Sequence, residues 1–182
     1  MKTIIIIVAL TVVGLAAFGI VSNMLNGAST VTSTTTAAAN SDLISVTIIG
    51  EVNHTGTFSV SKNATLGDLI DAANGVNTNA DPLAYDTSCT LRAKETYYIA
   101  PIYDNSTSCS ITPIKKCNVN SADADTIVSV TSVSQTVANA IVNYRTENDR
   151  FACLEDLKNV SGIGAATYTK MRTKVTLRDA EV

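Results

Sequence analysis

Apolar residues run from Ile4 to Val21 without a charge, and Lys2 precedes them. A run of about 18 residues extends roughly 27 Å as a helix, which is long enough to cross a bilayer. We therefore expect residues 1–25 to form a transmembrane anchor, with a cleaved signal peptide as the alternative. With Lys2 inside, both interpretations predict that the rest of the chain lies outside the cytoplasm, at the cell membrane.

Residues 26–42 are rich in Ser, Thr and Ala and predict a flexible linker. Residues 43–104, which follow, predict a domain with both strands and a helix. Two β-branched runs joined by "EVNHTG" predict a β-hairpin. Apolar residues at helical spacing after Thr65, with Asp68 three positions later, predict a capped helix. Thr96 to Ile102 predicts a returning strand. The expected fold class is α+β, with the sheet packed on the helix.

Residues 115–178, after a second linker at 105–114, predict a separate all-α domain with an internal repeat. A shift of 30 positions places "TIVSVTSVSQTVANAI" over "DLKNVSGIGAATYTKM", so that apolar residues coincide. The aligned pairs are Ile127 with Leu157, Val130 with Val160, Val133 with Ile163, and Ile141 with Met171. Each copy predicts a short helix, a tight turn and a second helix.

The turn of the second copy predicts a phosphate site. Gly162 can adopt a positive φ, Ile163 fills the space between two helices, and Gly164 removes side-chain bulk where the next helix begins. Exposed amides at that helix start would bind a phosphate oxygen without reading bases. The expected contacts are Ser161, Gly162, Ile163, Gly164 and Ala165, supplemented by Lys170, Arg172 and Lys174 on the same face.

The corresponding turn of the first copy is Ser132-Val133-Ser134-Gln135 and has no glycine. A serine at a positive φ costs on the order of 1 kcal/mol, although its hydroxyl can donate to a phosphate. Ser132, Ser134 and Gln135 are therefore weaker candidates for phosphate contacts. The second turn is expected to carry most of the binding.

Charge excludes a globally basic protein, because 13 Lys and Arg face 16 Asp and Glu, a net charge of -3. Residues 42–104 contain 3 basic and 8 acidic side chains, whereas residues from 115 onward contain 9 and 8. Phosphate binding is therefore expected only in the second domain. We expect no cofactor and no enzymatic activity: His54 is the one histidine, and it lies in a predicted turn without a catalytic partner.

Four cysteines in an exported chain favour disulfides over free thiols, and their spacing does not suit a metal site. Three pairings are possible. We prefer Cys89 with Cys109 and Cys117 with Cys153, because each bridge then stays within one expected domain.

Residues Leu43 to Ile102 resemble the SLBB domain, a β-grasp module. The resemblance rests on a set of fold-determining positions: Gly50, Val52, Gly56, Leu66, Asp68, Ile70, Gly75, Ala80 and Asp81. Residues from Lys116 to Leu177 resemble the tandem helix-hairpin-helix domain of the ComEA family of competence DNA receptors. The signature residues are Asn118, Asn120, Ala122, Ala140, Ile141, Tyr144, Arg145, Asn148, Phe151, Glu155, Asp156, Leu157, Val160, Gly162, Ile163 and Gly164.

The order of anchor, SLBB module and hairpin domain is that of the ComEA family in Gram-positive-type chains. The resemblance implies a receptor for double-stranded DNA without sequence specificity, used in DNA uptake. The implied partners are the phosphate backbone of duplex DNA, the membrane, uptake-channel and pilus proteins, and other copies of the chain through the SLBB module. The alternative is an exported structural module, or one that binds protein or polysaccharide, whose hairpins do not bind DNA.

Overall fold

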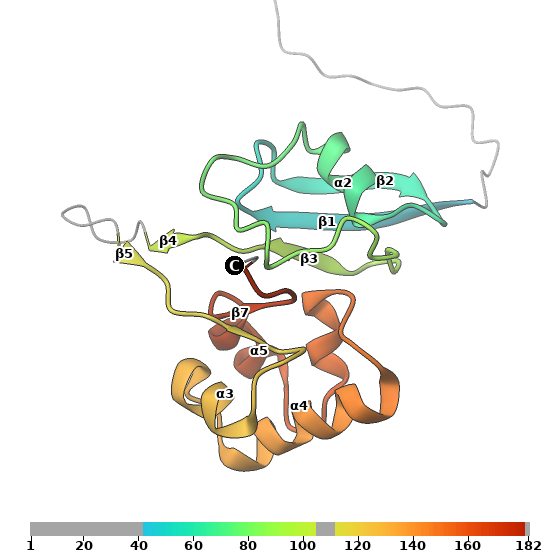
Figure 1. The fold of residues 1–182 in the computed structure, drawn as a ribbon. Helices are drawn as coiled ribbons and strands as arrows, with labels where there is room; N and C mark the ends of the chain where they lie inside the picture. The colour runs from blue at the N-terminus through green and yellow to red at the C-terminus, as the bar shows by residue number, and fades with distance from the viewer. Residues whose placement is uncertain (1–41, 105–111, 181–182) are drawn as a thin grey trace, which may run out of the picture. The chain divides into compact units, whose positions relative to one another are not determined.

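The computed structural model describes residues 42–104 and 112–180, which lie in one compact unit, Asn40–Val182. Two hydrophobic cores define a β lobe, residues 42–104, and a helical lobe, residues 112–180 (Figure 1). The expected anchor and all of the first linker except Asp42 lie outside the described residues. Within the described ranges, no helix is long and apolar enough to cross a membrane.

A three-stranded sheet in the order β2-β1-β3 forms the β lobe. β1 (Leu43–Gly50) pairs antiparallel with β2 (Gly56–Ser61) and parallel with β3 (Thr96–Ile99), as the expected hairpin and returning strand require. Val46 and Ile48 are fully buried on one side of β1, because alternate residues of a strand face opposite sides.

The helix α2 (Leu66–Ala72) packs on this sheet and confirms the predicted cap. The Thr65 side chain accepts a hydrogen bond from the Asp68 amide, and the Asp68 carboxylate accepts one from the Thr65 amide at 2.7 Å. This reciprocal pair satisfies two amides that a helix start otherwise leaves unbonded. Leu66, Leu69 and Ile70 are buried in the core of the β lobe.

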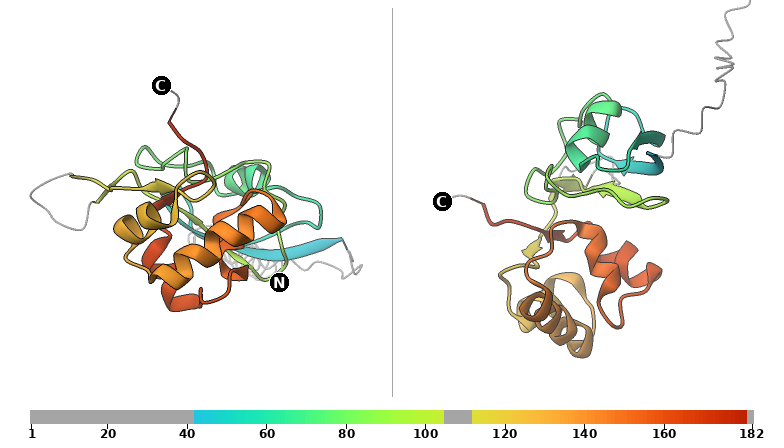
Figure 2. Two further views of the ribbon diagram at one scale, coloured as in Figure 1. Left: turned by 60° about the horizontal axis from the view of Figure 1, so that its bottom comes forward. Right: turned by 90° about the vertical axis from the view of Figure 1, so that its right-hand side faces the viewer.

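Two helical hairpins form the helical lobe, and the turned views in Figure 2 show their helices gathered on one another. The first hairpin joins α3 (Ala124–Thr131) to α4 (Gln135–Asn148), and the second joins the 3-10 helix η1 (Leu154–Asn159) to α5 (Ala165–Met171). The predicted repeat is confirmed, because Ile127, Leu157, Ile141 and Met171 are all 0% exposed in a shared core.

Short strands modify the expected all-α architecture of this lobe. β6 (Cys117–Asn118) pairs parallel with β7 (Val175–Thr176) and joins the two ends of the lobe. A further pair, β4 (Tyr103–Asp104) with β5 (Thr112–Pro113), is antiparallel and extends into the segment expected to be a linker. Helical periodicity carries no signal for pairs of two residues, so the sequence did not predict them.

The disulfide in the structure joins Cys89 to Cys153, so both preferred pairings are wrong. This bridge crosses between the lobes, with the two Cα atoms 5.7 Å apart. The preference for bridges within one domain failed because η1, which follows Cys153, packs against β3 of the β lobe. Cys117 is a buried free thiol whose pKa is raised by burial, and Cys109 lies outside the described residues.

Candidate nucleic-acid interface

Hairpin 2, residues 161–165, connects η1 to α5 and confirms the conformation expected for its first glycine. Gly162 has φ +88°, and a Cβ atom there would lie 3.0 Å from Val137 Cγ2 of α4. Ile163 is 4% exposed and packs in the core of the helical lobe. Gly162 is therefore required by the fold of the hairpin itself, both for its backbone and for its contact with α4.

Gly164 has a different reason to be glycine. It is the N-cap of α5 with φ -82°, a conformation open to any residue, and no side chain caps this helix. A Cβ atom at this position would meet no atom of the described residues within 4 Å. The protein's own packing does not require a glycine here, so the space above the first amides of α5 remains open to a partner.

Hairpin 1, residues 131–135, has the same backbone path without glycine. Ser132 has φ 60° and ψ 30°, the left-handed conformation expected to carry a penalty. The Ser134 hydroxyl caps α4 by accepting from the Val137 amide at 3.4 Å. The Gln135 side chain donates to Asp125 Oδ1 at 3.1 Å, so its amide group already has a partner within the lobe.

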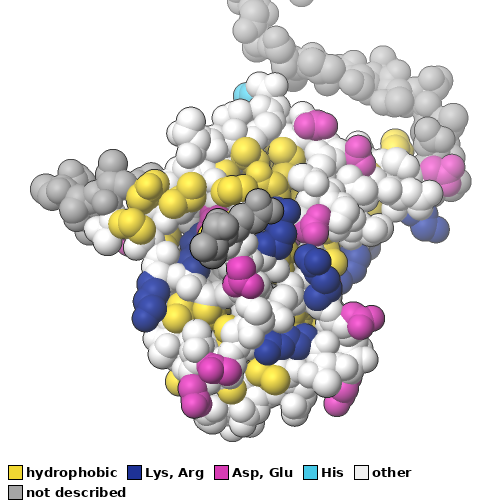
Figure 3. All heavy atoms as spheres, in the orientation of Figure 1, with side chains coloured by type: hydrophobic (Ala, Val, Ile, Leu, Met, Phe, Trp, Pro, Cys, Tyr) yellow, Lys and Arg dark blue, Asp and Glu magenta, His cyan; other side chains and the backbone are white. Residues whose placement is uncertain are grey.

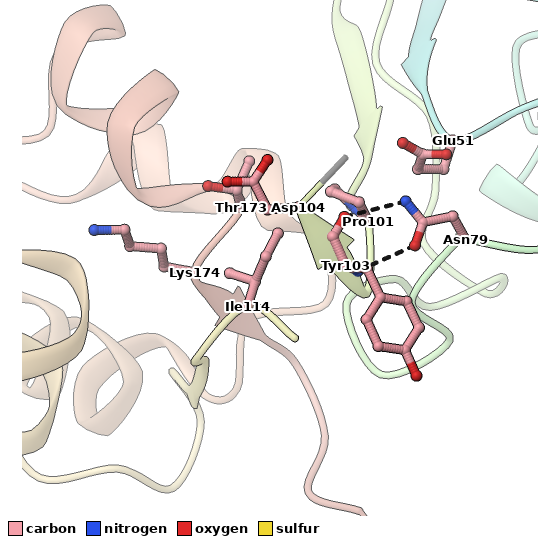
Figure 4. A pocket seen from close by; sticks show the side chains of 8 residues that line it. All are labelled: Glu51, Asn79, Pro101, Tyr103, Asp104, Ile114, Thr173 and Lys174. Atoms are coloured by element: carbon pink, nitrogen blue, oxygen red, sulfur yellow. Dashed lines mark hydrogen bonds between the residues drawn. The ribbon is translucent and has the colours of Figure 1, made fainter. Parts of the chain in front are cut away.

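The three cations expected on one face with the hairpins lie in different places. Lys170 is exposed on α5 and lines a hollow together with Ser132 and Ser134 of hairpin 1. Arg172 lies over the Tyr98 ring of the β lobe, 3.9 Å from its centroid. Lys174 lines another cavity with Glu51, as Figure 4 shows. Only Lys170 adjoins a hairpin, so the expectation of a shared face is not met.

Most other cations of the helical lobe are engaged with neighbouring groups, several of them in the acidic β lobe. Lys116 pairs with Asp81 at 2.5 Å, Lys158 with Glu95 at 2.6 Å, and Arg150 with Asp86 at 3.7 Å. Backbone carbonyls hold the other two: Arg145 donates to Val119 O, and Arg178 to Pro82 O and Tyr85 O. On the face drawn in Figure 3, most of the visible Lys and Arg side chains lie around the zone where the lobes meet.

The side chains of four cations of this lobe form no hydrogen bond or ion pair with another described residue: Lys115, Lys170, Lys174, and Arg172, which instead stacks on Tyr98. A small number of available cations implies few neutralised phosphates. Backbone amides and hydroxyls must then supply much of any interaction with a nucleic acid.

A buried carboxylate, Glu155, connects hairpin 2 to the β lobe and was not singled out as a site from the sequence. Its Oε1 atom accepts from the Tyr98 amide of β3 and from the Tyr168 hydroxyl of α5, both at 2.9 Å. Glu155 is 2% exposed, and its burial raises the pKa of the carboxyl above the ordinary value. Glu155 therefore joins η1 and α5, the two helices that flank hairpin 2, to the edge of the sheet.

We expect Glu155→Gln to make stability less dependent on pH. A raised pKa in the folded state means that the contribution of this group to stability is complete below its ordinary value of 4.5 and is lost as pH rises through the folded value. Gln keeps the oxygen that accepts both hydrogen bonds but cannot ionise. The melting temperature of the variant minus that of the wild type should therefore increase as pH rises from about 4 to about 8. Exposed Glu147→Gln is the matched control, and an equal difference at every pH would contradict this role.

Comparison with known proteins agrees with the two lobes. Residues 45–92 match the SLBB domain, and residues 113–176 match the helix-hairpin-helix motif. The chain is 25% identical over 159 residues to ComE operon protein 1 of Bacillus subtilis, which covers 77% of this chain and 75% of that protein.

Two shorter matches concern other proteins. Endonuclease/exonuclease/phosphatase family domain-containing protein 1 of Mus musculus is 36% identical over 69 residues, which is 38% of this chain and 12% of that protein. An uncharacterized protein of Haemophilus influenzae is 41% identical over 61 residues, 33% of this chain and 54% of that protein. Neither covers enough of both chains to carry an activity across.

The two matches define the class of protein, an SLBB domain followed by a helix-hairpin-helix domain. Together with a relative that aligns over three quarters of its length, these domains support the assignment of the chain to the ComEA family. The resemblance carried by its sequence motifs is thereby confirmed.

Proposed function

We propose that this chain is a receptor that holds double-stranded DNA by its phosphate backbone, without sequence preference, during DNA uptake in natural transformation. Membership of the ComEA family supports a DNA-binding role in competence, and it points to a binding protein and not to an enzyme. Backbone amides carry no information about bases, which agrees with binding independent of sequence.

The observation that carries this proposal is the open space at Gly164. Gly164 has a negative φ, and a side chain there would contact none of the described residues. The fold therefore does not require a glycine at this position. Because glycine has no side chain, a phosphate oxygen can closely approach the first backbone amides of α5. Gly162 and buried Ile163 fix the turn that presents these amides.

The proposed receptor binds each DNA segment weakly. Because few cations are available, we expect about 2 or 3 neutralised phosphates per chain. Anchoring by residues 1–25 would confine many copies to one surface, and several weak sites on one polymer act with the avidity of linked sites. The uptake channel, pilus proteins and other copies of the chain remain proposed partners.

A second candidate function is a structural or protein-binding module without DNA. It is favoured by the cations of the helical lobe that pair with Asp81, Asp86 and Glu95 of the β lobe, because those charges serve cohesion between the lobes. Duplex binding at low salt separates the two candidates.

Fluorescence anisotropy of residues 40–182 with labelled duplexes tests the proposal. Two duplexes of unrelated sequence should bind with equal affinity, and the plot of log K against log salt should have a slope of roughly -2 to -3 between about 50 mM and about 200 mM. No binding at the lower concentration would favour the structural module. A strong preference for one sequence would contradict recognition through the backbone.

A further inference from the structure

A hollow of about 240 Å³ lies beside hairpin 1, between the starts of α4 and α5. It is wide enough for several water molecules or for one tetrahedral anion. Its lining combines hydroxyl, apolar and cationic side chains from both repeats: Thr131, Ser132, Val133, Ser134, Val137, Thr167 and Lys170. Neither Thr131 nor Thr167 nor Val137 stood out in the sequence as a site residue.

The two hairpins have different surroundings because each faces the second helix of the other repeat. A shift of 30 positions pairs Val137 with Thr167 and Ala140 with Lys170. Hairpin 2 therefore has apolar support from α4, where Val137 Cγ2 closely approaches Gly162. Hairpin 1 instead adjoins Thr167 and Lys170 of α5, which are its polar and cationic counterparts.

Several of the polar groups at this hollow are free to bind an anion. The hydroxyls of Ser132 and Thr167 and the ammonium of Lys170 have no hydrogen-bond partner among the described residues. Thr131 already donates to Ile127 O at 2.8 Å, and Ser134 accepts from the Val137 amide. No carboxylate of the described residues lines the hollow, and Asp125, which contacts hairpin 1, accepts from Gln135.

We propose that hairpin 1 binds a DNA phosphate through side chains, with Lys170 of the second repeat as its counter-charge. The hydroxyls of Ser132 and Thr167 donate to the phosphate oxygens, and the Lys170 ammonium neutralises its charge. This inference rests on the proposed function and specifies how the hairpin without glycine takes part. The loss of amide recognition in one repeat is offset by side chains on the α5 helix of the other.

The test compares Lys170→Ala and Thr167→Val with the wild type in residues 40–182, with a random duplex as the probe. Lys170→Ala should weaken binding roughly fivefold at about 50 mM salt and reduce the magnitude of the salt slope by about one, because one phosphate contact is lost. Thr167→Val removes a hydroxyl at nearly constant volume and should weaken binding roughly twofold to threefold with an unchanged slope. Lys170→Arg should retain the wild-type slope.

Lys62→Ala is the matched control, because it removes one exposed positive charge from the β lobe. If Lys170→Ala behaves like Lys62→Ala while the wild type binds the duplex and Gly164→Asp weakens that binding, the phosphate site at hairpin 1 is refuted and DNA binding by hairpin 2 stands. If the wild type does not bind the duplex, both proposals fall. Thermal melting of each variant shows that a change in slope does not reflect unfolding.

Discussion

Replacing Cys89 and Cys153 together by serine is expected to lower the free energy of unfolding of residues 40–182 by about 4 kcal/mol. The bridge closes a loop with a sequence separation of 64, and the chain-entropy relation gives about 4 kcal/mol for a loop of this length. A loss of this size is a large part of the roughly 5–15 kcal/mol that stabilises a typical domain. Urea unfolding of the two proteins, followed by circular dichroism, measures the difference.

The bridge also fixes one end of the contact between the lobes. Cys153 immediately precedes η1, and Asp156 of η1 pairs with Arg92 at 2.7 Å. Without the bridge, this pair and Lys158–Glu95 remain at this end of the contact, but ion pairs that are partly open to solvent contribute little. We therefore expect the variant to unfold with loss of cooperativity between the lobes. Peptide mapping under non-reducing conditions is the control, and a Cys89–Cys109 peptide would contradict the structure.

Local patterns predicted the elements of this fold well. The capped helix after Thr65, the β-hairpin and the helical repeat follow from periodicity and turn chemistry within short segments. The aligned pair Ile127 and Leu157 was found in the sequence because both copies fold in the same way. These features were predictable because each depends on neighbours close in the chain.

Features that depend on how the lobes dock were not predictable. The Cys89–Cys153 bridge, the stacking of Arg172 on Tyr98 and the burial of Glu155 each join residues far apart in sequence. Counts of basic residues showed where positive charge lies along the chain but not which way it faces. The repeat itself distinguished Lys170, because the 30-residue shift aligns this lysine with Ala140. A charged residue in one copy and an apolar one in the other indicates that the two hairpins have different surroundings.

Gly164→Asp is expected to weaken duplex binding roughly 10- to 100-fold at low salt without destabilising the protein. The carboxylate would occupy the space that a glycine leaves open at this position, accept from the first amides of α5, and repel a phosphate oxygen. Asp is among the preferred N-cap residues, so α5 should be at least as stable as with glycine. Anisotropy titration and thermal melting of the same samples measure the two effects separately.

Gly164→Asn separates the effect of charge from that of bulk. Asn matches Asp in size and in its ability to cap α5, but it is neutral and leaves the phosphate unrepelled. We expect it to weaken binding roughly threefold to tenfold, between the wild type and Gly164→Asp. Because a Cβ atom at this position meets none of the residues that the structure describes, a loss of binding in folded variants has to arise at the surface shared with DNA. Wild-type affinity in both variants would mean that the amides of α5 do not contact the duplex.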